Sequence, residues 1–124
     1  MAKVLTLGGV FVRSPDREAL AAWYARWLGF EIDESFGGSV FQPSAVPPGG
    51  YQLWSPFAAD SDYFPREQSV MLNLIVDDVP GALAQVAEGG AEVVGEIDES
   101  EFGVFGWFVD PDGNKIELWQ PPAP

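Results

Sequence analysis

The feature that most constrains the fold is an internal repeat. Tyr-Gln-Leu-Trp-Ser-Pro at 51–56 closes the first half of the chain, and Ile-Glu-Leu-Trp-Gln-Pro at 116–121 nearly closes the second. In both halves this phrase comes after an apolar run, a helical pattern and further short apolar runs. Self-similarity of this kind indicates a duplicated supersecondary unit. We therefore expect each phrase to form the last strand of its own half.

The first half begins with a predicted strand and a predicted helix. Residues 4–14 are rich in β-branched and apolar residues, which is typical of a strand. Residues 14–30 follow, with Ser14 as the predicted cap, apolar residues at helical spacing, and Gly29 as the end of the helix. Short apolar runs then lead to the strand at 51–56.

The second half repeats this order. Residues 70–76 are predicted to be a strand and residues 77–90 a shorter helix that ends at a glycine pair. Asp-Pro-Asp-Gly at 110–113 lies between apolar runs and predicts a hairpin turn. The predicted fold class is α+β, with tandem βαβββ modules whose curved, mixed sheet forms a cup with the helices outside.

A chain of 124 residues is long enough for one well-buried domain and too short for two ordinary ones. We predict a single domain over 1–124, with module one at about 3–56, a linker at 57–69 and module two at about 70–121. Three aromatic residues in the linker leave two interpretations open, an ordinary anchored loop or a cap over a pocket or a partner subunit.

The composition disfavours several classes of partner. The net charge of −13 repels phosphate backbones and anionic membrane surfaces, which argues against nucleic-acid and membrane binding. The N-terminal apolar stretch lacks a small-residue cleavage site, so we interpret it as a strand and not as a secretory signal. The absence of cysteine excludes disulfides and thiolate chemistry and agrees with a cytoplasmic location.

This plan resembles the vicinal oxygen chelate superfamily, which includes glyoxalases, bleomycin-resistance proteins and extradiol dioxygenases. The resemblance is carried by residues 14–31, by residues 75–93, and above all by Gly-Trp-Phe-Val-Asp-Pro-Asp-Gly-Asn-Lys-Ile-Glu-Leu-Trp-Gln-Pro at 106–121. It implies that both modules curl into one cup that holds a ligand or a metal, and that the protein is a homodimer.

The resemblance also implies where a metal would be held. The positions that supply metal ligands in the metalloenzymes fall on Gly9, Gln52, Met71 and Glu117. Zinc, nickel and ferrous iron require several imidazole, carboxylate or thiolate ligands, and the chain contains no histidine or cysteine. We therefore predict no metal and no cofactor.

Strand alternation assigns the residues of the two closing phrases to faces. Ile116 and Leu118 should face the helix, Tyr51 and Leu53 should pack inward, and the residues between them should face the cup. Glu117 then has two interpretations, an inherited carboxylate without a chemical role or the anchor of a ligand's hydroxyl, amine or cation. Arg13 is either a rim residue or an exposed surface residue. The predicted ligand-binding residues are Gly9, Phe11, Gln52, Trp54, Met71, Asn73, Trp107, Phe108, Glu117 and Trp119.

Each of these assignments has an alternative. Gly8 and Gly9 either mark a bulge or give a ligand room, and the aromatic residues are either core or the walls of the cup. Asn73 lies in an apolar strand, where its amide needs a hydrogen-bond partner. The function that we expect is binding of a small, partly aromatic molecule. There are two alternatives. One is a lyase, isomerase or dioxygenase that uses Glu117 as its candidate catalytic residue, with or without an unusual metal site. The other is a structural or regulatory dimer with an unused cup.

Overall fold

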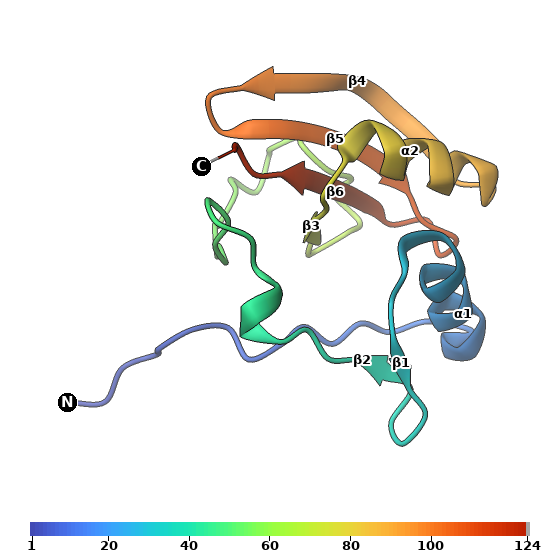
Figure 1. The fold of residues 1–124 in the computed structure, drawn as a ribbon, viewed down its shortest axis with the longest axis horizontal. Coiled ribbons are helices and arrows are strands. Elements are labelled where there is room, and N and C mark those ends of the chain that lie inside the picture. Colours follow the sequence, from blue (N-terminus) through green and yellow to red (C-terminus); the bar gives the residue numbers. More distant parts are fainter. Residues whose placement is uncertain (124) are drawn as a thin grey trace.

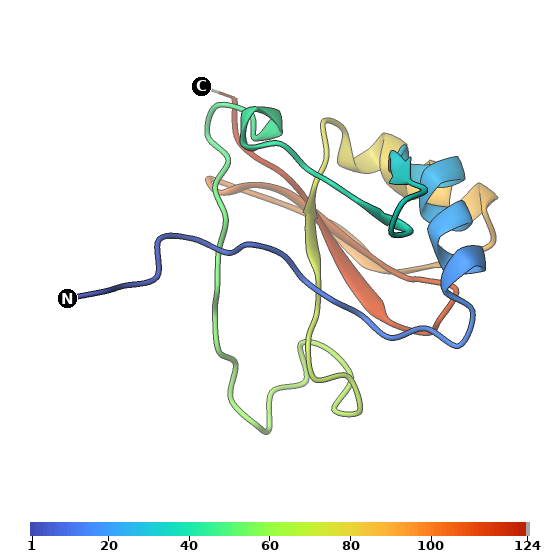
Figure 2. The ribbon, with the colours of Figure 1, turned by 90° about the horizontal axis from the view of Figure 1, so that it is seen from below.

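The computed structural model describes residues 1–123 and contains two α-helices, six strands and one 3-10 turn in this range. In Figures 1 and 2 the second helix lies against the larger sheet, the first helix lies beside the second, and the N-terminal segment runs away from the sheet to its free end. The predicted fold class, α+β, is confirmed. Neither helix of the described residues is long and apolar enough to cross a membrane.

The larger sheet belongs to the second half of the chain. Its strands are β3 (Asn73–Ile75), β4 (Glu92–Ser100), β5 (Gly103–Val109) and β6 (Lys115–Gln120), in the spatial order β3-β6-β5-β4. β3 runs parallel to β6, and the other neighbours are antiparallel. This is the βαβββ order predicted for the second half, with a first strand shorter than the predicted 70–76.

The helices begin and end where side chains can satisfy their free backbone groups. The Asp16 carboxylate accepts from the Ala19 N–H at 3.0 Å and caps α1 (Arg17–Leu28), so the prediction of Ser14 as the cap was wrong. Ser14 lies two residues before Asp16, and its hydroxyl accepts from the Asp16 N–H instead. Gly29 ends α1 in the left-handed region at φ 70°, as predicted. Asp78 caps α2 (Val79–Glu88).

The core lies between the helices and one face of the larger sheet. Phe108, Ile116 and Leu118 point toward α2 and are 0–1% exposed. This confirms the predicted inward face of the closing phrase at 116–121. α2 packs so closely on β5 that a Cβ atom added at Gly106 would lie 2.8 Å from the Leu83 side chain.

A buried hydrogen bond joins α1 to the turn between β5 and β6. The Tyr24 hydroxyl donates to Asp110 Oδ2 at 2.9 Å, while Asp110 Oδ1 accepts from the backbone N–H groups of Asp112 and Asn114. Burial, and then the charge of Asp110, raise the pKa of Tyr24, so its hydroxyl stays a donor. Gly113 completes the predicted Asp-Pro-Asp-Gly turn at φ 85°.

The first half of the chain forms much less sheet than predicted. Besides α1, it contains only β1 (Ile32–Asp33) paired with β2 (Gly38–Ser39), and the 3-10 turn η1 (Pro43–Ala45). Residues 4–14 and 51–56 are extended without being strands, so both of these strand predictions were wrong. Their composition suits a strand, but a strand also needs a neighbour for its backbone groups, and neither segment has one.

The same lack of a neighbour changes the side-chain environment at 51–56. Tyr51 and Leu53 were predicted to pack inward and are 52% and 69% exposed. No helix or second strand covers this segment, so alternation alone does not bury them. The cup that joins both halves therefore stays a prediction.

Candidate functional site

The candidate site lies on the face of the larger sheet that points away from the helices. Cross-strand pairing places Trp107 and Asn73 on either side of Glu117, and Phe105 beside Trp119. Because side chains alternate along a strand, these residues share one face, while Phe108, Ile116 and Leu118 occupy the other. The structure thus brings together four of the predicted site residues: Asn73, Trp107, Glu117 and Trp119.

Glu117 is buried, with 8% of its surface exposed, and its carboxylate accepts three hydrogen bonds. Asn73 Nδ2 donates to Oε1 at 2.6 Å, Trp107 Nε1 donates to Oε2 at 2.9 Å, and the Tyr63 hydroxyl also donates to Oε2. All three donors are uncharged. A carboxylate has about four acceptor positions, so one position remains on Oε1, beside the exposed Asn73.

Tyr63 comes from the segment between the two halves and is held over the sheet. Burial, and then its hydrogen bond to Glu117, raise the pKa of Tyr63, so the phenol stays protonated and donates. Lys115 Nζ donates to the Tyr63 carbonyl at 2.6 Å. Gln68 pairs with the backbone of Lys115 through both its amide nitrogen and its oxygen. These contacts fix the segment 57–69 against Glu117.

Aromatic rings surround the carboxylate on this side. The Tyr63 ring meets the Trp107 ring edge to face at 6.2 Å and stacks on Phe57 at 5.3 Å. The ammonium group of Lys115 lies 5.3 Å from the Tyr63 ring and 5.8 Å from the Trp107 ring. An anion, a cation and three flat apolar surfaces therefore lie within one small region.

A second aromatic group lies further along the same face. The Trp119 ring stacks on Phe105 at 6.2 Å with an interplanar angle of 12°, and Tyr51 meets it edge-on at 4.9 Å. Trp119 Nε1 donates to the Phe102 carbonyl at 2.7 Å, so the indole is fixed in place. Trp119 is 5% exposed, which makes it a wall of the site more than a free surface.

The other predicted site residues lie elsewhere. Gly9, Phe11, Gln52 and Trp54 belong to the extended segments of the first half, where Phe11 is 100% and Trp54 76% exposed. Gln52 Oε1 accepts from the Thr6 hydroxyl at 2.7 Å and is not among the partners of Glu117. Arg13 is likewise exposed.

Met71 and Phe108 come from the second half. Met71 is half-buried just before β3, whereas Phe108 is fully buried in the core under the helices. The structure therefore does not bring Phe108 to the face that carries Glu117.

Sequence reasoning missed Tyr63, Lys115 and Phe105. Tyr63 contacts Glu117 across 54 positions of the chain, and no spacing rule predicts such a contact. The three aromatic residues of an otherwise polar linker were the available signal. Lys115 and Phe105 follow from the hairpin register, because each lies two residues from a predicted site residue on the same strand face.

The donor set does not fit a transition metal. Within residues 1–123, no three His, Cys, Asp or Glu side chains are grouped as metal ligands. Glu117 is the one strong ligand among the four family positions, and its oxygens already accept three hydrogen bonds. Zinc and ferrous sites take three or four nitrogen, oxygen or sulfur ligands from the protein.

Two hollows on the surface of residues 1–123 lie away from Glu117. One of about 360 Å³ opens between the end of α1 and the start of α2, and one of about 530 Å³ lies between α1 and the β1–β2 pair. The face that carries Glu117 is lined with aromatic and polar groups, but neither hollow includes it.

Comparison with known proteins places the chain in a family. Residues 9–119 match the family described as the glyoxalase-like domain. The crystal structure of TnmS3, an antibiotic binding protein from Streptomyces sp. CB03234, is 32% identical, with 90% of this chain and 91% of that chain covered and a TM-score of 0.54. No curated protein matches.

Two further crystal structures are similar. A protein of unknown function from Agrobacterium tumefaciens str. C58 is 20% identical over 97% of this chain and 100% of that chain, with a TM-score of 0.53, and supports the fold. A member of the glyoxalase/bleomycin resistance protein/dioxygenase superfamily from Sphaerobacter thermophilus DSM 20745 is 24% identical over 92% of this chain and 99% of that chain, with a TM-score of 0.49. Because the family match spans residues 9–119 of the 124, this protein belongs to the glyoxalase-like domain family, as its resemblance to the vicinal oxygen chelate superfamily predicted.

Proposed function

We propose that this protein binds a small, partly aromatic organic molecule at the face that carries Glu117, and that it does so without a metal. One observation carries the proposal. A buried carboxylate is held by three uncharged donors among aromatic rings and keeps one acceptor position on Oε1. A few fixed polar groups on an otherwise aromatic surface are the usual composition of a small-molecule site.

Each part of the site has a role in this proposal. Glu117 Oε1 accepts a hydrogen bond from a hydroxyl or a protonated amine of the ligand, and the exposed amide of Asn73 lies beside it. Trp107 and Trp119 contact the flat part of the ligand. The predicted cup would bring residues of the first half, Phe11 and Trp54 among them, to the opposite wall.

The relatives support a binding role. TnmS3, an antibiotic binding protein, is 32% identical to this chain over nine-tenths of its length. By analogy we propose an antibiotic or a similar natural product as the class of ligand. Fold alone does not fix the ligand, so the proposal rests on the site first and on this relative second.

The experiment is a ligand screen followed by one isosteric substitution. Aromatic natural products, with and without a basic amine, are screened by tryptophan fluorescence, and binders are measured by calorimetry on the wild type and on Glu117→Gln. We expect Glu117→Gln to weaken binding by roughly 1.5–3 kcal/mol, because it removes a charge-assisted hydrogen bond. The melting temperature should stay within a few degrees.

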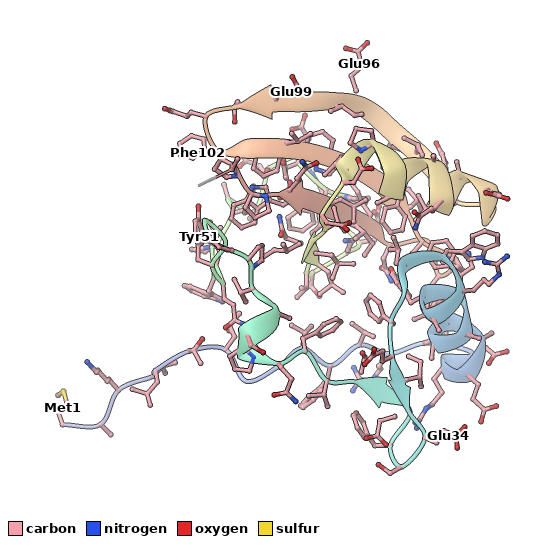
Figure 3. The ribbon with its side chains drawn as sticks, in the orientation of Figure 1. Met1, Glu34, Tyr51, Glu96, Glu99 and Phe102 are labelled. Atoms are coloured by element: carbon pink, nitrogen blue, oxygen red, sulfur yellow. The ribbon has the colours of Figure 1, made fainter. Side chains whose placement is uncertain are left out.

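The matched control is Glu96→Gln. Glu96 lies on β4 and points away from the sheet in Figure 3, so its charge is lost without any contact to the site. The affinity of Glu96→Gln for the ligand should equal that of the wild type. Equal affinities in Glu117→Gln and the wild type, for a ligand that quenches tryptophan fluorescence, would refute the anchoring role.

We also propose that the protein works as a homodimer in the cytoplasm. Eighteen large hydrophobic side chains among residues 1–123 are exposed in the single chain, and twofold association is the commonest way to cover such a surface. Light scattering at micromolar concentration should give about twice the chain mass of 13.5 kDa. A mass of one chain would contradict the dimer, and cell fractionation tests the location.

A further inference from the structure

The space beside the Glu117 carboxylate is filled by a part of the chain itself. The Tyr63 hydroxyl donates to Glu117 Oε2, and the Tyr63 ring meets the Trp107 ring edge to face at 6.2 Å. Neither of the two hollows on the surface of residues 1–123 includes this place. A ligand that is to contact both Glu117 and Trp107 therefore meets the Tyr63 ring first.

Tyr63 has the chemistry that this site is expected to recognise in a ligand. Its side chain is a flat ring with one hydrogen-bond donor, and the donor reaches the carboxylate. One side of the ring stacks on Phe57 at 5.3 Å, and the ammonium group of Lys115 lies 5.3 Å from the ring centre. Cations are attracted to the electron-rich face of an aromatic ring. The groups around Tyr63 thus form a place that suits a phenol, an aromatic ring that carries a hydroxyl group.

The charges around this place favour a neutral phenol over an anion. Burial, and then the hydrogen bond to Glu117, raise the pKa of Tyr63, so the protonated phenol is the stable form beside this carboxylate. A carboxylate or phenolate ligand would also meet the field of a chain whose net charge is −13. Acidic ligands are therefore disfavoured, and a hydroxyl donor is favoured.

The segment 57–69, which carries Tyr63, is attached to the rest of the molecule at few points. Figure 2 shows it as an irregular loop that leads into β3, and most of its residues are exposed. Its backbone-to-backbone hydrogen bonds run only within the segment, as far as residues 1–123 show. Its hydrogen bonds to the sheet involve only Tyr63 and Gln68. A segment with so few contacts opens at a low cost in free energy.

These two attachments differ in kind. The Gln68 side-chain amide donates to the Lys115 carbonyl and accepts from the Lys115 N–H, both at 2.8 Å, as a neighbouring strand would do. Tyr63 is held through its hydroxyl and ring, and through its carbonyl, which accepts from Lys115 Nζ at 2.6 Å. A free phenol can make the hydroxyl and ring contacts in its place. Gln68 can therefore keep the segment attached while Tyr63 leaves.

We propose that the segment 57–69 is a strap that closes the Glu117 site in the free protein, with Tyr63 in the place of the ligand, and that the ligand is a phenol that displaces it. This inference rests on the proposed function and adds the ligand class and the regulation of the same site. The ligand hydroxyl binds the carboxylate, and its ring replaces the Tyr63 ring beside Trp107. The closed strap lowers the apparent affinity by the fraction of molecules in which it is open.

The test uses 4-methylphenol, which is the tyrosine side chain as a free molecule. It is titrated into the wild type and into Tyr63→Ala, and binding is followed by the NMR signal of the Trp107 indole N–H, which donates to Glu117. We expect a dissociation constant about tenfold or more lower in Tyr63→Ala, because the strap no longer competes. Toluene should bind this variant about tenfold more weakly than 4-methylphenol, since it leaves the carboxylate without its donor.

Three further measurements serve as controls. Phe36→Ala removes an exposed ring at the β1–β2 turn, and its dissociation constant for 4-methylphenol should equal that of the wild type. Tyr63→Phe keeps the ring without the hydroxyl and should bind about fivefold more tightly than the wild type. In the wild type, 4-methylphenol at saturation should speed cleavage within 57–69 by a protease. If Tyr63→Ala fails to fold, the last two measurements decide.

The outcomes separate this inference from the function on which it rests. Equal or weaker binding of 4-methylphenol in Tyr63→Ala makes Tyr63 a wall of the site and overturns the strap alone. Slower cleavage of 57–69 with ligand bound means that the segment closes over the ligand, and also overturns the strap alone. A screened ligand that binds through Glu117 while 4-methylphenol does not bind Tyr63→Ala overturns the phenol class. Failure of every compound to bind overturns both proposals.

Discussion

The two closing phrases of the repeat have almost the same sequence and very different surroundings. Leu118 is 0% exposed and Trp119 5%, whereas Leu53 is 69% and Trp54 76% exposed. The second phrase lies between β3 and β5 and under α2, and the first has no strand beside it. The difference teaches that an alternating apolar pattern specifies which side chains can be buried, while the neighbouring strands determine whether they are.

The largest test of this comparison exchanges the matched leucines for alanine. Leu118→Ala should lower the free energy of unfolding by about 2–5 kcal/mol, because it leaves a cavity in the core. Leu53→Ala should change it by less than about 0.5 kcal/mol in the dilute single chain. Urea unfolding at two protein concentrations measures both. Equal losses of unfolding free energy at low protein concentration would contradict the comparison. A Leu53→Ala loss that grows with protein concentration would place Leu53 in the dimer interface.

The buried tyrosine of the first half gives the next largest effect. Tyr24→Phe removes the donor to Asp110 Oδ2 inside the core, and should lower the free energy of unfolding by about 1–3 kcal/mol. Urea unfolding near pH 8 measures this loss. A loss below a few tenths of a kcal/mol would mean that α1 is held to the sheet by apolar packing alone.

The same tyrosine predicts a dependence on pH. The pKa of Tyr24 is raised in the folded protein, so its contribution is complete below the pKa of an unfolded tyrosine, about 10, and is lost as the pH rises above it. The unfolded chain then releases a proton that the folded chain retains. Stability of the wild type should fall progressively as the pH rises above about 10, and less steeply in Tyr24→Phe. Parallel curves would contradict this assignment.

A second matched pair compares tyrosines on the two sides of the site. Tyr63→Phe removes a donor to Glu117 and frees the segment 57–69, which should cost about 1 kcal/mol and increase cleavage of this segment by a protease. Tyr51→Phe keeps the ring that meets Trp119 and should change stability by less than about 0.5 kcal/mol. Unchanged proteolysis in Tyr63→Phe would show that Gln68 and Lys115 hold the segment without it.

The smallest expected effect is that of metal removal. Protein dialysed against zinc, nickel, manganese and ferrous iron should retain less than about one-tenth of an equivalent, since the donors are too few. Treatment with a chelator should leave the melting temperature unchanged. Stoichiometric binding that disappears in Glu117→Ala would contradict a metal-free site.

Local signals in the sequence predicted most of the second half and the end of α1 well. The Asp-Pro-Asp-Gly turn and the end of α1 at Gly29 each depend on residues close together in the chain. The burial of Ile116 and Leu118 depends on strand alternation, which places both side chains on the face that α2 covers. The partner that the sequence required for Asn73 is Glu117, on the adjacent strand.

The parts that could not be predicted depend on distant contacts. Residues 4–14 have strand composition, but composition does not supply the neighbour that a strand needs. The Tyr63 contact to Glu117 arises from the path of a linker that has no periodicity. Gln52 is exposed because residues 51–56 also lack a neighbouring strand. The repeat in the sequence is therefore not matched by a repeat in the structure.

The parallel pairing of β3 with β6 has a consequence for the order of events in folding. β4, β5 and β6 follow one another through short turns, whereas Asn73 meets Glu117 across 44 positions. Distant pairs close late, because the chain loses the entropy of the intervening loop before any contact offsets it. We therefore expect β3 to join the sheet last. Pairing of β3 with β6 should therefore appear as a separate, slower folding phase after the β4–β5–β6 hairpins have formed.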